Sequence, residues 1–312
     1  MSEESLTESQ MDAIREAEKV LLAKQLKNLS ILAQQKVATF LAGTRKSKFR
    51  GDGTDFADLR DYVPGDDLRK VDWKATARYK NRLIVKEFEQ ERNANVVILL
   101  DASASMLIGK REPRIKAAVE AIASLTYATI MNKDFIGFAA YSSELSQFIP
   151  PKGGKTHEFF IYHKLLTLTP IGETNLGEAL KEVSTLLKRQ SLILVISDLH
   201  DKLDETFRGF RIAKALKHEV QLLQITDYGE FILPDNMGKV KFTDPTTKQP
   251  VTIDLSDPLS RGLYDYVIFQ KVKEIEDFKR KLRGLKIRVV ESHTEDITQQ
   301  VLLAYYSAKG RA

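Results

Sequence analysis

From Asn95 to the end of the chain, short apolar segments alternate with longer segments of helical periodicity. The apolar runs are uninterrupted, as in Val96–Leu100 and Leu192–Ile196. A strand that is apolar on both faces is buried on both, so such runs predict a mostly parallel sheet with helices covering each side. We therefore predict a doubly wound α/β domain over residues 95–312.

The pattern predicts the order of the elements in this domain. The expected strands are 96–101, 134–141, 145–149, 192–198, 220–226 and 286–290. The expected helices are 113–131, 157–168, 176–189, 205–218, 262–283 and 297–308. Residues 239–243 and 251–255 flank a proline-rich turn, which predicts a β-hairpin within 239–255. The aliphatic-rich stretch 117–130 is expected to supply core packing against the sheet.

Two segments of different character precede the domain. Residues 1–43 are rich in Glu, Gln, Ala, Lys and Leu, and they predict two helices or one broken helix. Thr7–Gln10 resembles a capping box that opens a helix, and Gly43 is a stop signal. Residues 44–94 carry crowded charges of both signs and predict a turn-rich linking segment with short strands, including one over 83–88. Within it, Pro64-Gly65 suits the centre of a type II turn.

The composition places the chain among soluble globular proteins. Its 312 residues are 43% hydrophobic and 29% charged. We find no apolar run near the ~20 residues that span a bilayer and no signal-peptide pattern at the amino terminus, so a cytoplasmic location fits best. The absence of cysteine excludes disulfides and cysteine-based zinc sites.

The charge balance leaves one alternative open. The formal net charge is +5, which a mild excess of solvated lysines explains. The densest basic cluster, Arg45–Arg50, is too short to identify a nucleic-acid binder. A nucleic-acid-binding module is therefore an alternative that steeply salt-dependent binding would support, and not our main hypothesis.

Side chains whose oxygen atoms could bind a metal ion follow two of the predicted strands and precede one predicted helix. Asp101, Ser103 and Ser105 lie directly after the first strand of the domain, Asp198 ends a later strand, and Thr174 precedes a helix. In open α/β sheets ligands gather beyond the carboxyl ends of the strands, so these residues converge if the two strands are neighbours. Carboxylates and hydroxyls without His or Cys favour Mg²⁺ or Mn²⁺ over zinc. The alternative is that Asp101 and the serines merely cap the following chain.

This set resembles the metal-ion-dependent adhesion site of von Willebrand factor A domains, residue by residue. The resemblance implies a von Willebrand factor A-like, Rossmann-like sheet and a metal held by Asp101, Ser103, Ser105, Thr174 and Asp198. Because Mg²⁺ wants six oxygens, one position stays open for water or for the carboxylate of a partner protein. The implied function is a non-enzymatic, metal-dependent protein interaction.

A second stretch narrows the resemblance. It carries the pattern Tyr-x-Pro-Gly-Asp-Asp-x-Arg-x-x-Asp-Trp from residue 62 onward. Together with the Asp-x-Ser-x-Ser-Met run, this pattern resembles the bacterial family called domain of unknown function 58, over about residues 45–310. The resemblance implies association with MoxR-type AAA+ ATPases, as an adaptor or co-chaperone that helps to assemble or activate client proteins.

The same stretch has two physical interpretations. Its charges can form an ionic network that holds two subdomains together, with Trp73 as an anchor. Alternatively it is a docking surface for a partner. The candidate docking residues are Arg60, Asp66, Asp67, Arg69, Asp72, Trp73 and Arg78.

An enzyme is the remaining alternative. A metal-dependent phosphoesterase could use the same oxygens, but such sites usually need more carboxylates and a general base. The run Gly153–Thr156 ends like a phosphate-binding loop, yet Ile149 stands where that loop needs glycine, so we interpret it as a turn and helix start. The five histidines show no metal-ligand spacing, and His200 is expected to face solvent. We therefore expect no enzymatic activity.

Overall fold

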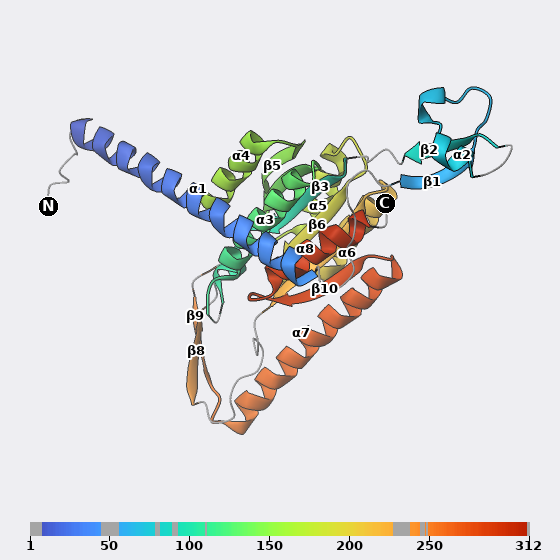
Figure 1. Ribbon diagram of the computed structural model, residues 1–312. Coiled ribbons are helices and arrows are strands. Elements are labelled where there is room, and N and C mark those ends of the chain that lie inside the picture. The colour runs from blue at the N-terminus through green and yellow to red at the C-terminus, as the bar shows by residue number, and fades with distance from the viewer. Residues whose placement is uncertain are drawn as a thin grey trace. The chain divides into compact units, whose positions relative to one another are not determined.

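The computed structural model describes residues 8–44, 56–78, 82–88, 93–109, 111–226, 238–243, 247 and 249–310 (Figure 1). Thr7 of the expected capping box and the basic cluster 45–50 lie outside the described residues. The chain divides into two compact units, one made of residues 1–40 and 94–312 and the other of residues 41–93.

The described part of the larger unit contains a six-stranded sheet in the order β10-β7-β6-β3-β4-β5. The strands are β3 (Asn95–Asp101), β4 (Phe135–Tyr141), β5 (Leu145–Lys152), β6 (Leu192–Ser197), β7 (Glu219–Thr226) and β10 (Arg288–His293). All neighbours are parallel except β5, which runs antiparallel to β4 at the edge. The first strand is central and the chain winds outward from it in both directions. This is the predicted doubly wound, von Willebrand factor A-like α/β architecture.

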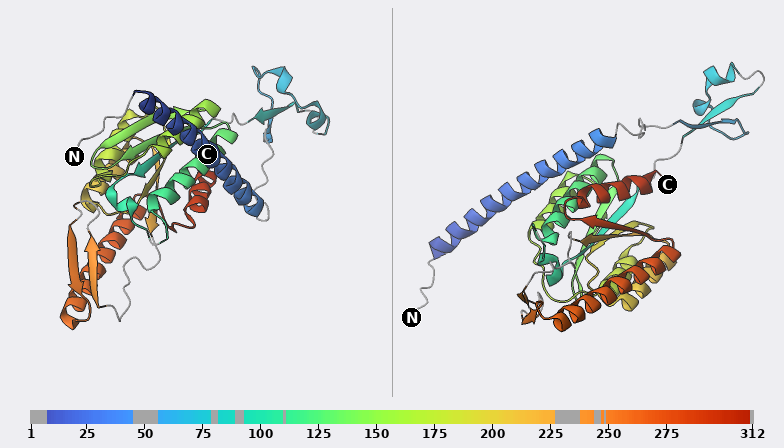
Figure 2. Two further views of the ribbon diagram at one scale, coloured as in Figure 1. Left: turned by 90° about the vertical axis from the view of Figure 1, so that its left-hand side faces the viewer. Right: turned by 90° about the horizontal axis from the view of Figure 1, so that it is seen from below.

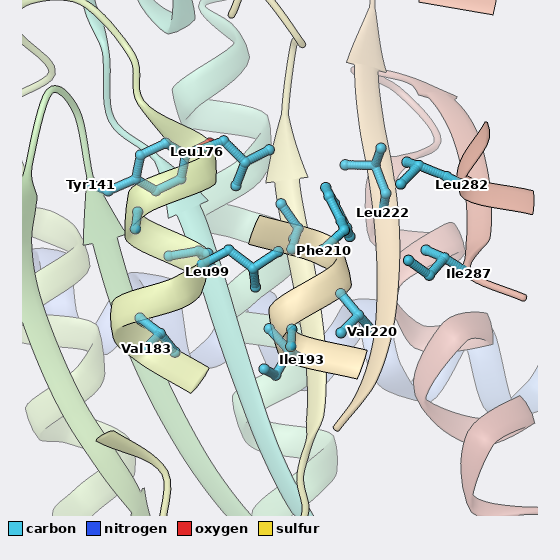
Figure 3. Packing of buried hydrophobic residues seen from close by; sticks show 14 of the residues in the cluster. Leu99, Tyr141, Leu176, Val183, Ile193, Phe210, Val220, Leu222, Leu282 and Ile287 are labelled. Atoms are coloured by element: carbon cyan, nitrogen blue, oxygen red, sulfur yellow. The ribbon is translucent and has the colours of Figure 1, made fainter. Parts of the chain in front are cut away.

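Helices cover both faces of this sheet. They are α3 (Arg114–Met131), α4 (Lys155–Leu166), α5 (Leu176–Leu186), α6 (Leu203–Ala215), α7 (Pro258–Gly284) and α8 (Ile297–Lys309). One face packs against α5, α6 and the carboxyl-terminal half of α7 (Figure 3). The right-hand view of Figure 2 shows α3 and α8 on the opposite side of the sheet from α7. The predicted helices are therefore present, with bounds shifted by a few residues.

The apolar runs form strands because both of their faces are buried. Val97 and Leu99 belong to the cluster beneath α5 and α6, whereas Val96, Ile98 and Leu100 point to the other face. All five side chains are fully buried. Each such side chain contributes about 1.5–3 kcal/mol of hydrophobic free energy to folding. Residues 117–130 of α3 also contribute to the core as expected, and the small side chains among them are buried.

The amino-terminal segment is one helix, α1 (Glu8–Thr44), and not the two helices or broken helix that the sequence predicted. It ends at Thr44, one residue after Gly43, which agrees with the predicted stop signal. The carboxyl-terminal half is held on the domain by buried Ala33 and Val37. Lys36 Nζ also lies 2.7 Å from Oε2 of Glu120 on α3.

The smaller unit contains a two-stranded antiparallel sheet of β1 (Phe56–Asp61) and β2 (Ile84–Phe88), and β2 confirms the expected strand over 83–88. Between the strands lie a short 3-10 helix, η1 (Leu68–Lys70), and one helical turn, α2 (Trp73–Thr76). The predicted turn is present: Asp66 N donates to Val63 O at 3.0 Å, and Gly65 has a φ of 112°. A positive φ at this position is what a type II turn requires of its glycine.

Two further expectations for the larger unit are confirmed. β8 (Lys239–Thr243) and β9 (Pro250–Asp254) pair antiparallel as the predicted hairpin. The Gly153–Thr156 run is a turn and helix start, since β5 ends at Lys152 and α4 begins at Lys155 after Gly154 with a φ of 95°. Among the described residues, no helix is both long and apolar enough to cross a membrane.

Candidate metal centre

The two strands that carry the predicted ligands are neighbours. β3 and β6 pair in parallel, with Leu100 opposite Ile196. They are the central pair, where the sheet order reverses, and ligands of doubly wound sheets bind at this switch point. Asp101 ends β3 and Asp198 follows β6, so both carboxylates stand at the same edge, as the sequence predicted.

Asp101 is completely buried and surrounded by donors. Its Oδ2 accepts hydrogen bonds from Thr174 Oγ1 at 3.0 Å, Ser197 Oγ at 2.9 Å and Tyr141 OH at 3.1 Å. Its Oδ1 accepts from the backbone N–H of Ser103 at 3.0 Å. The structure therefore brings predicted Thr174 to Asp101 and adds Tyr141 and Ser197, which sequence reasoning missed.

Thr174 reaches this place because two loops pair through their backbones. Ala104 N donates to Gly172 O at 3.0 Å, and Ile171 N donates to Ala102 O at 3.0 Å. Gly172 has a φ of 75°, a conformation that glycine adopts without steric cost. The loop before α5 is thus fixed against the loop after β3.

The two serines lie side by side in the loop after β3. Ser103 Oγ and Ser105 Oγ are 3.0 Å apart. Ser103 stands immediately before a 3-10 helix, η2 (Ala104–Leu107), which the sequence did not predict, and its hydroxyl makes no capping bond to that helix. The capping alternative therefore does not describe the Ser103 side chain, although Asp101 does accept the N–H two residues on.

Asp198 is engaged by two basic side chains. Arg114 Nη1 lies 3.1 Å from Asp198 Oδ2, and the two side chains are each 1% exposed. His200 Nδ1 lies 3.3 Å from the same oxygen. His200 is exposed, as expected, and its ring also lies against Asp198. Arg114 was missed because nothing in the sequence distinguishes it from a surface arginine.

These contacts give the carboxyl groups of Asp101 and Asp198 different pKa values. Burial, and then the negative charge of Asp198, raise the pKa of Asp101 to about 6. Burial also favours the neutral form of Asp198, but the hydrogen bond and charge of His200 and the charge of Arg114 outweigh it and lower that pKa to about 2. At neutral pH, Asp198 is therefore the firmly ionised member of the pair.

The donor set suits one hard divalent cation. Asp101, Ser103, Ser105 and Thr174 offer carboxylate and hydroxyl oxygens, the ligands of Mg²⁺ and Mn²⁺. Asp198 stands at the same edge, where it can act directly or through water. The described residues contain no group of three or more His, Cys, Asp or Glu side chains placed to hold a metal. The oxygens available for a metal at this edge are therefore mainly hydroxyls, with few carboxylates.

In the smaller unit, the acidic docking candidates serve local structure. Asp66 accepts two bonds of 2.6 Å from the Arg60 guanidinium and one of 2.9 Å from Val63 N. Asp67 and Asp72 cap the first backbone N–H groups of η1 and α2. These charges hold the turn and the two short helices in place, which accounts for their density without a partner.

The other docking candidates present side chains to solvent. Arg69 and Arg78 are exposed. Trp73, the single tryptophan of the sequence, is 67% exposed, so it is not an anchor buried in a core. An exposed tryptophan on the same short unit as two exposed arginines is a surface feature that local folding does not explain.

Solved structures similar to this chain include BatB from Bacteroides thetaiotaomicron and an Rpn10 VWA domain. BatB is 16% identical in sequence to this chain, with a TM-score of 0.48. The alignment covers 70% of this chain and 100% of the BatB chain. The Rpn10 domain is 15% identical, with a TM-score of 0.38. The alignment covers 44% of this chain and 77% of the Rpn10 chain.

Sequence relatives lie in bacteria. Uncharacterized proteins of Mycobacterium tuberculosis (Rv1480) and Mycobacterium bovis (Mb1516) are 27% identical over 231 residues, which are 72% of this chain and 70% of theirs. YeaD of Bacillus subtilis is 29% identical over 107 residues, which are 34% of this chain and 25% of its own. The family described as "Protein of unknown function DUF58" matches residues 58–272. The chain therefore belongs to the DUF58 family.

Proposed function

We propose that the protein is a non-enzymatic, metal-dependent protein-interaction module. Asp101, Ser103, Ser105 and Thr174, with Asp198, would hold Mg²⁺ or Mn²⁺. The bound ion would supply an electrophilic coordination position for the carboxylate of a partner. The observation that carries this proposal is the convergence of three described hydroxyl groups on one oxygen of buried Asp101, at the switch point of the sheet.

The geometry favours binding over catalysis. A metal-dependent phosphoesterase needs ligands for its metals and a base that can take a proton from water. Asp198 is engaged by Arg114 and His200, and Asp101 is enclosed by hydroxyl donors. Nearby Asp201 accepts hydrogen bonds from Leu176 N and Thr206 Oγ1. Each of these three carboxyl groups therefore already serves the local structure.

The partner we propose is a MoxR-type AAA+ ATPase, for which this protein would act as a cytoplasmic adaptor or co-chaperone in the assembly or activation of client proteins. Membership of the DUF58 family supports this choice of partner through the resemblance noted above. The exposed Trp73, Arg69 and Arg78 would provide a second contact surface on the smaller unit.

Binding of the purified ATPase tests the proposal. Since an AAA+ ATPase uses Mg²⁺ with its own nucleotide, the ATPase is kept free of nucleotide, and capture is compared in Mg²⁺, in EDTA, and in EDTA followed by excess Mg²⁺. We expect capture by wild type in Mg²⁺ alone and after Mg²⁺ is restored.

Asp101→Ala should abolish capture, whereas the matched control Glu178→Ala should not. Glu178 lies on α5 near the site but is exposed and pairs with Lys181. Capture that survives both EDTA and Asp101→Ala would refute the metal mechanism. Magnesium-dependent hydrolysis of a phosphoester that is lost in Asp101→Ala would instead indicate an enzyme.

A further inference from the structure

A buried cation lies beside the candidate metal centre. Arg114 is the first residue of α3, and its side chain is among the largest that the structure fully buries. Arginine is seldom buried without a carboxylate partner, because removing its charge from water costs several kcal/mol. Here the partner is Asp198, 3.1 Å away.

The fold holds this arginine in place from both sides. Arg114 N donates to Ile108 O at 3.2 Å, which ties the start of α3 to the loop that follows Ser105. Asp198 is fixed by the end of β6 and accepts from His200 N at 3.2 Å. The ion pair therefore joins the ligand-bearing loop after β3 to the loop after β6.

The ion pair changes the charge of the site. Apart from the neighbouring His200 and Asp201, the ionised Asp101 and Asp198 and the Arg114 guanidinium give the metal-free site one net negative charge, and a divalent cation turns this into one net positive charge. Without the guanidinium, the two carboxylates would cancel the charge of the ion completely. A loaded site of zero net charge would attract an anion much less strongly than a positively charged site.

We propose that Arg114 is the specificity-determining residue of this site: it leaves the loaded site positive and so selects a carboxylate as the ligand of the open position. This inference rests on the proposed metal-binding function. It has a signature that a purely structural role lacks, because the guanidinium repels the metal ion while it promotes capture of the anion. Removing it should tighten metal binding and weaken anion binding together.

The test uses Mn²⁺ alone and acetate as a carboxylate probe. Free Mn²⁺ is titrated by electron paramagnetic resonance at pH 8, in acetate and in chloride at equal ionic strength. Acetate that binds the loaded wild-type site must raise the apparent Mn²⁺ affinity, because the coupling is reciprocal. Any complexation of Mn²⁺ by acetate in solution is the same for all variants.

We expect Arg114→Met to bind Mn²⁺ about tenfold more tightly in chloride and to lose the effect of acetate. Arg114→Lys keeps the charge and should behave as wild type. Weaker Mn²⁺ binding by Arg114→Met, or an unchanged effect of acetate, would overturn the inference while leaving the proposed function intact. Failure of wild type to bind Mn²⁺ in either buffer would overturn the proposed function itself.

A second variant tests the inference if Arg114→Met alone fails to fold. Arg114→Met leaves Asp198 charged and buried, whereas Arg114→Met combined with Asp198→Asn removes both charges of the pair. The double variant has the same net site charge as wild type, so we expect the effect of acetate to return. If the folded double variant binds Mn²⁺ without any effect of acetate, charge does not determine ligand choice and the inference fails.

Discussion

Thr174 Oγ1 donates a hydrogen bond to Asp101 Oδ2 at 3.0 Å, although the two residues are 73 positions apart in the sequence. Thr174 belongs to a loop, and Asp101 to the end of the central strand. Their contact depends on the backbone pairing of the two loops and not on any strand hydrogen bond. The threonine hydroxyl can therefore be removed without disturbing the sheet, which makes it a clean probe of the site.

Thr174→Val should lower Mn²⁺ affinity at least tenfold and leave stability nearly unchanged. Valine has the shape of threonine but lacks the ligand oxygen, and Asp101 keeps its hydrogen bonds from Ser197 and Tyr141. Thr174→Ser retains the hydroxyl and is the matched control. Calorimetric titration with Mn²⁺ provides the measurement, and equal affinities for all three proteins would exclude Thr174 as a ligand.

The raised pKa of Asp101 predicts how stability depends on pH in the metal-free protein. Burial raises this pKa from 3.8 to about 6, so the folded state binds the proton more tightly than the unfolded state. Stability from this group is therefore greatest at low pH and falls as pH rises between about 4 and 6, by about 3 kcal/mol at most. The lowered pKa of Asp198 acts in the opposite sense but below pH 4.

Urea denaturation in EDTA at pH 4.5 and 7.5 measures this effect. Other carboxyl groups also titrate in this window, so the comparison is with Asp101→Asn, which has no proton to lose. We expect the variant to gain stability relative to wild type at pH 7.5 but not at pH 4.5. A difference between the two proteins that does not change with pH would contradict the raised pKa. Metal affinity should show the reverse trend and weaken below pH 6, because the ion needs ionised Asp101.

The fold and the positions of Asp101 and Asp198 could be predicted because strands that are buried on both faces appear in the sequence as uninterrupted apolar runs. Asp101 and Asp198 each follow such a run, so their place at one edge of the sheet follows from topology alone. Tyr141 and Ser197 also had a signal, since Tyr141 ends a predicted strand and Ser197 is the next-to-last residue of another at the same edge. Inspection of all strand ends, and not of the motif alone, would have included them.

The burial of Arg114 and the continuity of helix α1 could not be predicted from a local sequence pattern. Arg114 is buried by the fold of a loop and a helix start, and a buried arginine looks like an exposed one in a single sequence. The continuity of helix α1 left no local signal either, and its second half is held by contacts of Lys36 with α3 and α8. Each of these depends on tertiary contacts and not on local pattern.

A close helix crossing supports the loops that carry the ligands. A Cβ on Gly209 of α6 would lie 2.3 Å from the carbonyl oxygen of Gly177 on α5, so the two backbones must separate to accept it. Gly209→Ala should therefore destabilise the protein by about 1–3 kcal/mol. Gly262→Ala on α7 meets nothing within 4 Å and should instead stabilise by about 0.5–1 kcal/mol. Thermal unfolding of the two variants distinguishes the crossing from a general effect of alanine, and equal shifts would contradict it.

The carboxyl-terminal half of α1 should detach when its buried face is charged. Ala33 is fully buried on this helix, whereas Ala38 is exposed five residues later. Ala33→Glu forces a carboxylate into the interface and should make α1 sensitive to limited proteolysis, while Ala38→Glu should leave it resistant. If Ala33→Glu is as resistant as wild type, the helix is not held by this face.

Trp73 reports on the smaller unit without interference, since it is the single tryptophan of the chain. Because its side chain is 67% exposed, its fluorescence should be strongly quenched by acrylamide and emit at the long wavelength typical of tryptophan in water. Binding of the ATPase should shift this emission to shorter wavelength and reduce quenching if Trp73 lies in the interface. Trp73→Ala should then weaken capture of the ATPase but leave Mn²⁺ affinity unchanged, because Trp73 contributes no ligand to the metal centre. Capture that leaves the emission unchanged would exclude Trp73 from the contact surface and confine the interaction to the larger unit.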